Sequence, residues 1–143
     1  MSAPITIQAI TENLRTVLSK EGLYFSVETY EGMDQVPASL LPLGQIFYKG
    51  ETFEYTHGQR PGYINAGFLL RVILRMRSPE DAVRDEEQWV HRIKTAITVN
   101  ALNINELALT KYVSRVMIGT IGIENKKEVS IVNMNVEIRY REV

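Results

Sequence analysis

Three arginines at alternating positions of one segment have the type and spacing that suit binding chemistry. Arg71, Arg75 and Arg77 lie in the stretch FLLRVILRMR, and because successive side chains of a strand point to opposite faces, all three belong to one face. Such a row of guanidinium groups can bind phosphates or carboxylates. An acidic segment follows directly. Three functions are therefore open for this region: a nucleic-acid face, a catalytic cluster, or a surface that meets another copy of the chain.

The surrounding residues favour an ion-paired face. Leu69 and Ile73 interrupt the arginine face, which also lacks the interleaved aromatic residues on which single-stranded nucleic acids stack. The net charge of the chain is −1, so no overall field attracts nucleic acid. Five carboxylates in the helix predicted next can neutralise the arginines: Glu80, Asp81, Asp85, Glu86 and Glu87. A nucleic-acid-binding module is kept as an alternative.

The sequence carries none of the common catalytic or metal-binding patterns. His57 falls in a predicted loop and His91 on a predicted helix, and neither belongs to an HExxH motif or a histidine pair at helical spacing. There is no cysteine, no GxSxG turn and no phosphate-binding loop. A hydrolase using His57, Arg60 and a carboxylate is the remaining enzymatic alternative, although a plain surface turn is the simpler interpretation of HGQRPG. We predict no catalytic residue, no cofactor and no metal ion.

Glu86 occupies an unusual position on its predicted helix. On a helical wheel it falls among Ala82, Trp89 and Ile93, in the middle of the apolar stripe. A buried carboxylate without a partner is unfavourable, so it should meet a cation or lie where the stripe leaves the core. Our hypothesis is that Glu86 meets an arginine of the 71–77 face, within the subunit or in a neighbouring one.

The composition indicates a folded, soluble, single-domain protein. The chain has 143 residues, of which 45% are hydrophobic and 23% charged. Its amino terminus lacks the basic start and apolar run of a signal peptide. No apolar stretch approaches the roughly 20 residues of a membrane helix. We expect a cytosol-made protein without a membrane partner.

The hydrophobic periodicity predicts an α+β fold with two main helices. In chain order, the predicted elements are a helix over 7–18, a strand over 23–30, two short extended pieces over 45–49 and 51–56 with a turn at Gly50, a strand over 68–77, a helix from Pro79 to about Thr98, a polar connection over 100–105, and a long hairpin with arms 111–122 and 129–141. Segments 33–44 and 57–62 are predicted loops. Strands in hairpins with helices between them favour a mostly antiparallel sheet.

The start of the second helix has a clear local signal. Ser78 can accept a hydrogen bond from a free amide of the first turn, and Pro79 suits the first helical position. Acidic residues dominate the early turns and basic residues the late ones, which complements the helix dipole. Gly22 stands where the first helix would need a left-handed residue to stop.

The first arm of the carboxy-terminal hairpin suggests self-assembly. Apolar residues occur on both of its faces, namely Tyr112, Val116, Met117, Ile118 and Ile121. A sheet that is apolar on both faces must be covered twice. Two amphipathic helices can cover one face, so the second face calls for a partner, and we expect a homo-oligomer.

Four segments follow one another along nearly the whole chain: an amino-terminal helix, the strand ending RVILRMRSPEDA, the helix EEQWVHRIKTAI and a final hairpin ending NVEIRYRE. This order of elements resembles the tail terminator proteins of long-tailed bacteriophages. These motifs are low in specificity and include no catalytic signature. The resemblance implies a non-enzymatic ring, usually a hexamer, that caps the finished tail tube and offers a docking surface to the neck.

The resemblance also implies where the protein works. It would be a virion component of the tail or neck, assembled in the host cytoplasm, with the tail tube protein and a neck or connector protein as partners. DNA would pass through the lumen without sequence readout, which fits the lack of a dense basic patch. Rival interpretations are another neck or head-completion adaptor and a tail tube subunit.

The resemblance suggests contact residues on exposure grounds alone. The candidates for the subunit interface are Arg71, Arg75, Arg77, Glu80, Asp81, Glu86, Tyr112, Arg115, Met117 and Arg139. The candidates for contacts with the tube or connector are Asp34, Gln35, Arg60, Lys126 and Lys127.

Overall fold

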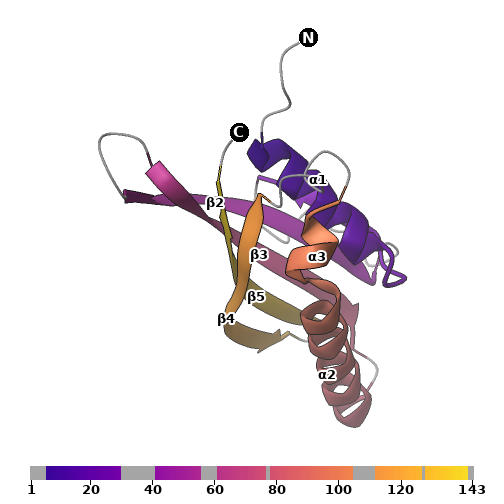
Figure 1. Cartoon of the computed structure of the whole chain (residues 1–143). Coiled ribbons are helices and arrows are strands. Elements are labelled where there is room, and N and C mark those ends of the chain that lie inside the picture. The colour runs from indigo at the N-terminus through magenta and orange to yellow at the C-terminus, as the bar shows by residue number, and fades with distance from the viewer. Residues whose placement is uncertain are drawn as a thin grey trace.

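The computed structural model is an α+β fold, as the sequence predicts, and its sheet is mixed and five-stranded (Figure 1). It describes residues 6–29, 41–55, 61–76, 78–104, 112–126 and 128–141. The elements in chain order are α1 (Thr6–Ser19), β1 (Phe25–Glu28), β2 (Leu43–Tyr55), β3 (Pro61–Arg75), α2 (Pro79–Ala96), α3 (Val99–Leu102), β4 (Val113–Asn125) and β5 (Val129–Tyr140). The strand order is β1-β2-β3-β5-β4, with β1 parallel to β2 and every other pair antiparallel.

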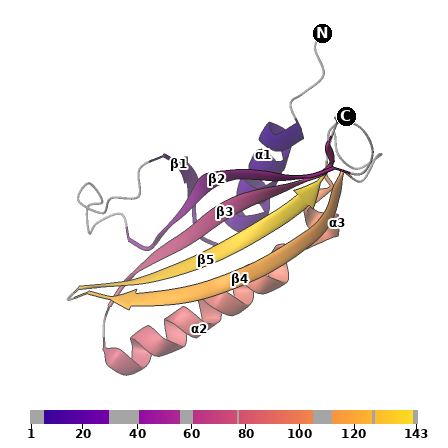
Figure 2. The ribbon, with the colours of Figure 1, turned by 90° about the vertical axis from the view of Figure 1, so that its left-hand side faces the viewer.

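The long central strand β3 divides its side chains between the two faces of the sheet. Phe68, Leu70 and Val72 pair with Val136, Met134 and Val132 of β5, and all six belong to the main core with residues of α1, α2 and α3. The alternate residues point to the other face, which the helices do not cover; Figure 2 shows the strands in front of α1 and α3. We call this second face the helix-free face.

The helix-free face is partly buried within the chain itself. Phe47, Leu69, Ile73 and Ile131 are each less than 9% exposed. The helices pack on the opposite face alone, as the sequence predicts. Because these four residues are buried within the chain, less apolar surface of the helix-free face is left for a partner than the sequence suggests. Toward β4 the same face becomes polar and exposed.

Three local predictions are confirmed by backbone geometry. Ser78 caps α2, because its Oγ accepts a hydrogen bond from the Asp81 amide at 3.2 Å, and Pro79 is the first helical residue. Gly22 has a φ of 89°, a left-handed conformation that favours glycine, although it lies three residues beyond the last residue of α1. The carboxy-terminal strands form the predicted hairpin.

Gly50 is the clearest error in the predicted elements. The sequence suggests a turn there between two short pieces, but β2 runs unbroken through it, and the register against β3 shifts between Tyr48 and Gly50. The φ of Gly50 is 102°. A left-handed glycine serves a β-bulge as well as a turn, and here it accommodates one extra residue while the strand continues.

The remaining differences concern where elements begin and end. β1 is shorter than the predicted 23–30 strand, and β3 begins at Pro61, within the predicted loop 57–62 and seven residues before Phe68. The short helix α3 begins just before the predicted polar connection and occupies its first residues. Asn103, just after it, closes a buried pair of hydrogen bonds with the backbone of Val113, which joins this connection to the start of β4.

Glu86 is buried in the apolar stripe of α2, as the helical wheel predicts, with 4% of its surface exposed. Its carboxylate accepts a hydrogen bond from the hydroxyl of Ser130, which is fully buried on β5. This hydroxyl is the partner that the structure gives Glu86. An arginine partner stays a prediction, because Arg77 lies outside the described residues and a neighbouring subunit can supply one.

Removing the Ser130 hydroxyl is predicted to destabilise the fold. Ser130→Ala leaves the buried Glu86 carboxyl without its donor and should lower the free energy of unfolding by about 1–3 kcal/mol in urea titrations. Ser114→Ala is the matched control, since its hydroxyl donates at an exposed site to the Arg139 carbonyl, and we expect a change within about 0.5 kcal/mol. Equal losses in the two variants would show that the buried pair is not responsible.

Candidate functional site

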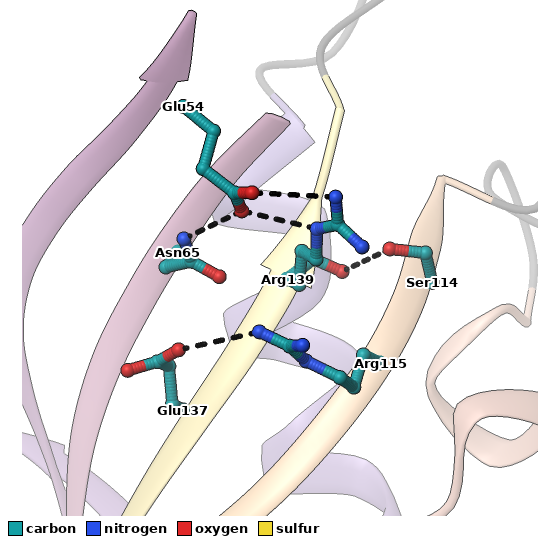
Figure 3. A network of polar contacts seen from close by, with 6 residues as sticks. All are labelled: Glu54, Asn65, Ser114, Arg115, Glu137 and Arg139. Carbon is teal, nitrogen blue, oxygen red and sulfur yellow. Dashed lines mark hydrogen bonds and ion pairs between the residues drawn. The ribbon is translucent and has the colours of Figure 1, made fainter. Parts of the chain in front are cut away.

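The candidate site is a network of charged and polar side chains on the helix-free face (Figure 3). It is built from the four neighbouring strands β2, β3, β5 and β4. Its members are Glu54, Asn65, Ser114, Arg115, Glu137 and Arg139. The register explains why they meet: Asn65 of β3 pairs with Arg139 of β5, which pairs with Arg115 of β4. Cross-strand pairs on one face bring side chains within interaction distance.

Arg139 is held on several sides. Its Nε lies 3.1 Å from Glu54 Oε2 and its Nη2 lies 3.4 Å from Glu54 Oε1, so the guanidinium donates to both carboxylate oxygens. Its Cζ also stacks 3.8 Å from the ring centroid of Tyr63. A planar guanidinium suits this combination of bidentate pairing and stacking. The guanidinium of Arg139 is therefore engaged by both Glu54 and Tyr63.

Arg115 is held much more loosely. Its closest ion-pair contact is to Glu137 at 3.8 Å, and each of the two side chains is 47% exposed. Exposed pairs at this separation contribute little to stability. The network therefore combines a fixed pair, Arg139 with Glu54, and an open pair, Arg115 with Glu137, whose groups can be shared with a docking partner.

Electrostatics hold the carboxyl of Glu54 in its charged form. The amide of Asn65 donates to Glu54 at 2.9 Å, and this hydrogen bond is the main cause of a Glu54 pKa below the ordinary value for glutamate. Burial opposes it, and the charge and hydrogen bond of Arg139 lower the pKa further. Asn65 Oδ1 is buried and has no hydrogen-bond partner among the described residues.

The sequence-predicted interface residues fall into two groups on opposite faces. Arg71 lies on the helix-free face, where its Nε donates to Asn133 at 2.8 Å and its guanidinium stacks over Phe47 at 5.1 Å. The structure thus gives Arg71 partners other than the acidic start of α2. Arg115, Met117 and Arg139 share this face, because they pair with or belong to its alternate β5 positions.

Residues of α2 lie on the other side of the sheet. Glu80 is exposed, and Asp81 lies 3.8 Å from Arg84 one turn along the helix. Arg75 lies at the end of β3 and borders a depression of about 380 Å³ together with Asp85 and Trp89. Arg75 therefore borders the same depression as Asp85, one of the five carboxylates that the sequence offers the arginines as partners.

The other predicted contact residues are dispersed or undescribed. Tyr112 packs partly against the core and its carbonyl accepts a hydrogen bond from the Arg141 amide. Lys126 is exposed at the tip of the β4–β5 hairpin, 3.9 Å from Glu124. The predicted residues that lie outside the described ones are Asp34, Gln35, His57, Arg60, Arg77 and Lys127.

Sequence reasoning missed Glu54, Tyr63 and Asn65. Glu54 and Arg139 are 85 residues apart, and only the strand register brings them together. The one usable signal was the run of polar residues at alternate positions of β5, which indicates a solvated face without identifying what lies opposite.

Other kinds of site find little support in the described part of the chain. No group of three histidine, aspartate or glutamate side chains within it can hold a metal ion. Within the same residues, no helix combines the length and apolarity needed to cross a membrane. No known family model matches the sequence, and no curated protein matches it significantly.

We predict that the hydrogen bond from the Asn65 amide keeps the pKa of Glu54 low. Because the folded pKa of Glu54 lies below the unfolded one, ionised Glu54 stabilises the fold above the unfolded pKa, and this contribution is lost as the pH falls through the folded pKa. Asn65→Ala should raise the pKa of Glu54 toward its ordinary value in a carboxyl-carbon NMR titration. Asn135→Ala, the same change elsewhere on this face, should leave it unmoved; a shift of equal size there would exclude the assigned cause.

Proposed function

We propose that this protein is a structural ring component of a long-tailed phage particle, of the tail terminator type. In this function, copies of the chain close into a hexameric ring that caps the tail tube, stops its polymerisation and offers a docking surface to the neck. The ring belongs to the virion tail or neck and assembles in the host cytoplasm. No catalysis, cofactor or membrane contact forms part of the proposal.

The one-sided sheet is the observation that carries this proposal. All three helices pack on one face, while the other face changes from a small buried cluster at Phe47 to an exposed polar surface at β4. On that surface Met117, with 46% of its area exposed, lies beside the open Arg115–Glu137 pair. Met117 therefore adds apolar surface inside a polar rim, which is the arrangement that protein interfaces share.

The charge arrangement supports passage of DNA without readout. In the network on the helix-free face, Arg115 and Arg139 are matched by Glu137 and Glu54. Binding to DNA needs an excess of cations that can release counterions from phosphates. A surface whose arginines are paired with carboxylates binds DNA weakly, as a conduit requires.

A tail tube subunit is the nearest alternative, and the sheet edges favour it. Within the described residues, β1 and β4 each pair with a single neighbour, so both ends of the sheet offer unpaired backbone groups. When copies join through two different surfaces, the rotation between neighbouring copies decides whether they close into a ring or grow into a filament. Filaments formed by the pure protein would favour the tube subunit.

Assembly of the purified chain tests the proposal directly. Native mass spectrometry and negative-stain microscopy should show a closed hexameric ring, or a monomer that forms one on the ends of tail tubes and prevents their growth. A strict monomer that neither assembles nor caps tubes would contradict the proposed function.

Met117→Asp is predicted to weaken the ring without unfolding the subunit. A charge placed on the exposed apolar surface should shift native mass spectra toward monomer, with a melting temperature within a few degrees of the wild type. Val83→Asp is the matched control, because Val83 is 52% exposed on α2, across the sheet from β4. Equal loss of the ring in both variants would mean that the helix-free face is not the contact.

A further inference from the structure

A shallow depression of about 320 Å³ lies on the helix-free face next to the polar network. Two glycines lie within its floor, Gly67 at the middle of β3 and Gly119 on β4. Met117, Asn135 and Glu137 border it on one side, and Lys49 on the other. The size suits one aromatic side chain, and the surface is mostly apolar between charged borders.

The packing of the chain itself does not require glycine at these two positions. A Cβ on Gly67 would meet its nearest atoms, the Gly50 carbonyl and the Lys49 Cβ, at 3.8 Å, and a Cβ on Gly119 would meet the Asn135 carbonyl at 3.6 Å. Both are ordinary van der Waals contacts, and neither glycine has a left-handed φ. Gly119 lies within the register shift of β4 between Ile118 and Ile121, and Gly67 pairs with Gly50 at the register shift of β2. Glycine inside a strand weakens it and marks either such a bulge or the close approach of another molecule. Because neither backbone conformation here requires glycine, the open surface at both positions remains to be explained.

The same chain carries an exposed aromatic element of suitable size. Among the described residues, the pairing of β3 with β5 ends at Ile64 and Tyr140, and residues 53–55 and 61–63 continue beyond it as a pair of strands. We call this the arm, and Figure 1 shows it projecting beyond α1. Phe53 and Tyr55 stand at alternate positions on it and are 50% and 60% exposed. A two-stranded ribbon is marginally stable in water, so this arm gains from being covered.

We propose that the depression at Gly67 and Gly119 receives an aromatic side chain from the arm of a second copy of this chain. One molecule presents both the projecting group and the recess at different places, which defines a head-to-tail contact that can repeat from copy to copy. The lining of the recess carries one cation and one carboxylate, Lys49 and Glu137, so the fit of the aromatic side chain depends on shape and apolar burial rather than on net charge.

This contact rests on the proposed ring in one respect: it names the surfaces through which neighbouring subunits would join. It also stands as a statement about two copies of the chain, whatever their final assembly. The two ideas can therefore fail separately.

Filling the recess tests the proposal without disturbing the subunit. Gly67→Val and Gly119→Val should each raise the dissociation constant for self-association at least about tenfold, measured by sedimentation velocity. The melting temperature should stay level or rise, because a branched residue favours a strand. Gly122→Val is the matched control, since Gly122 lies on β4 outside the recess with open space around it. Unchanged self-association of the filled variants, or an equal effect of the control, would overturn the proposal.

A cross-link tests the contact directly, because the chain has no cysteine of its own. Tyr55→Cys and Gly67→Cys proteins, mixed and mildly oxidised, should form a disulfide-linked heterodimer in preference to either homodimer. Pairing of Tyr55→Cys with Gly122→Cys, or of Tyr24→Cys with Gly67→Cys, should be much weaker; Tyr24 is the other strongly exposed tyrosine in this comparison, at 67%. Equal or stronger cross-linking by either control pair would overturn the proposal.

The cross-linking and self-association results separate the arm contact from the proposed ring. Closed rings of the wild type without the Tyr55–Gly67 cross-link would overturn the arm contact and leave the ring proposal standing. The cross-link in a protein that neither closes rings nor caps tubes would support the arm contact and contradict the ring. Filled variants that still self-associate but lose their affinity for tail tubes would assign the recess to the tube protein and overturn the proposal.

Discussion

The two-residue period of β3 is the constraint on which the rest of the structure depends. This strand is paired on both sides along most of its length, so its even-numbered residues all face the helices and its odd-numbered residues all face away. A slip of one residue would exchange Leu70 and Arg71 and place a guanidinium in the core. The positions of the core, the arginine face and the glycine recess are therefore fixed together, and each follows from the same register.

The single layer of helices has a consequence for the strands that it does not cover. α1, α2 and α3 bury the apolar residues of one face, and Glu86 reaches from α2 to Ser130 through that layer. On the helix-free face, burial falls from Phe47 near the centre to Met117 at β4. This gradient leaves the β4 side as the region whose apolar surface is still available for a partner.

Local signals were predictable from the sequence, whereas long-range partners were not. The cap at Ser78 and the amphipathic stripe holding Glu86 depend on residues three to seven positions apart, and both were found. The sequence predicts a turn at Gly50 where the structure has a bulge, because the same left-handed backbone conformation serves both. Ser130 lies 44 residues from Glu86, and Arg139 lies 85 residues from Glu54. A periodic pattern indicates which face a residue occupies without indicating such a neighbour across the sheet.

The helix-free face separates two tasks that interfaces usually combine. The bidentate pair of Arg139 with Glu54, supported by Asn65 and Tyr63, keeps its charges matched and its strands aligned, so it adds rigidity rather than long-range attraction. The recess beside it has no side chain at Gly67, so selection there depends on shape. A rigid, charge-balanced frame around an open apolar recess selects its partner by shape. A partner that does not fill the recess leaves it hydrated and gains little binding energy from the neutralised borders. Such a surface can favour another copy of the same chain while binding DNA weakly.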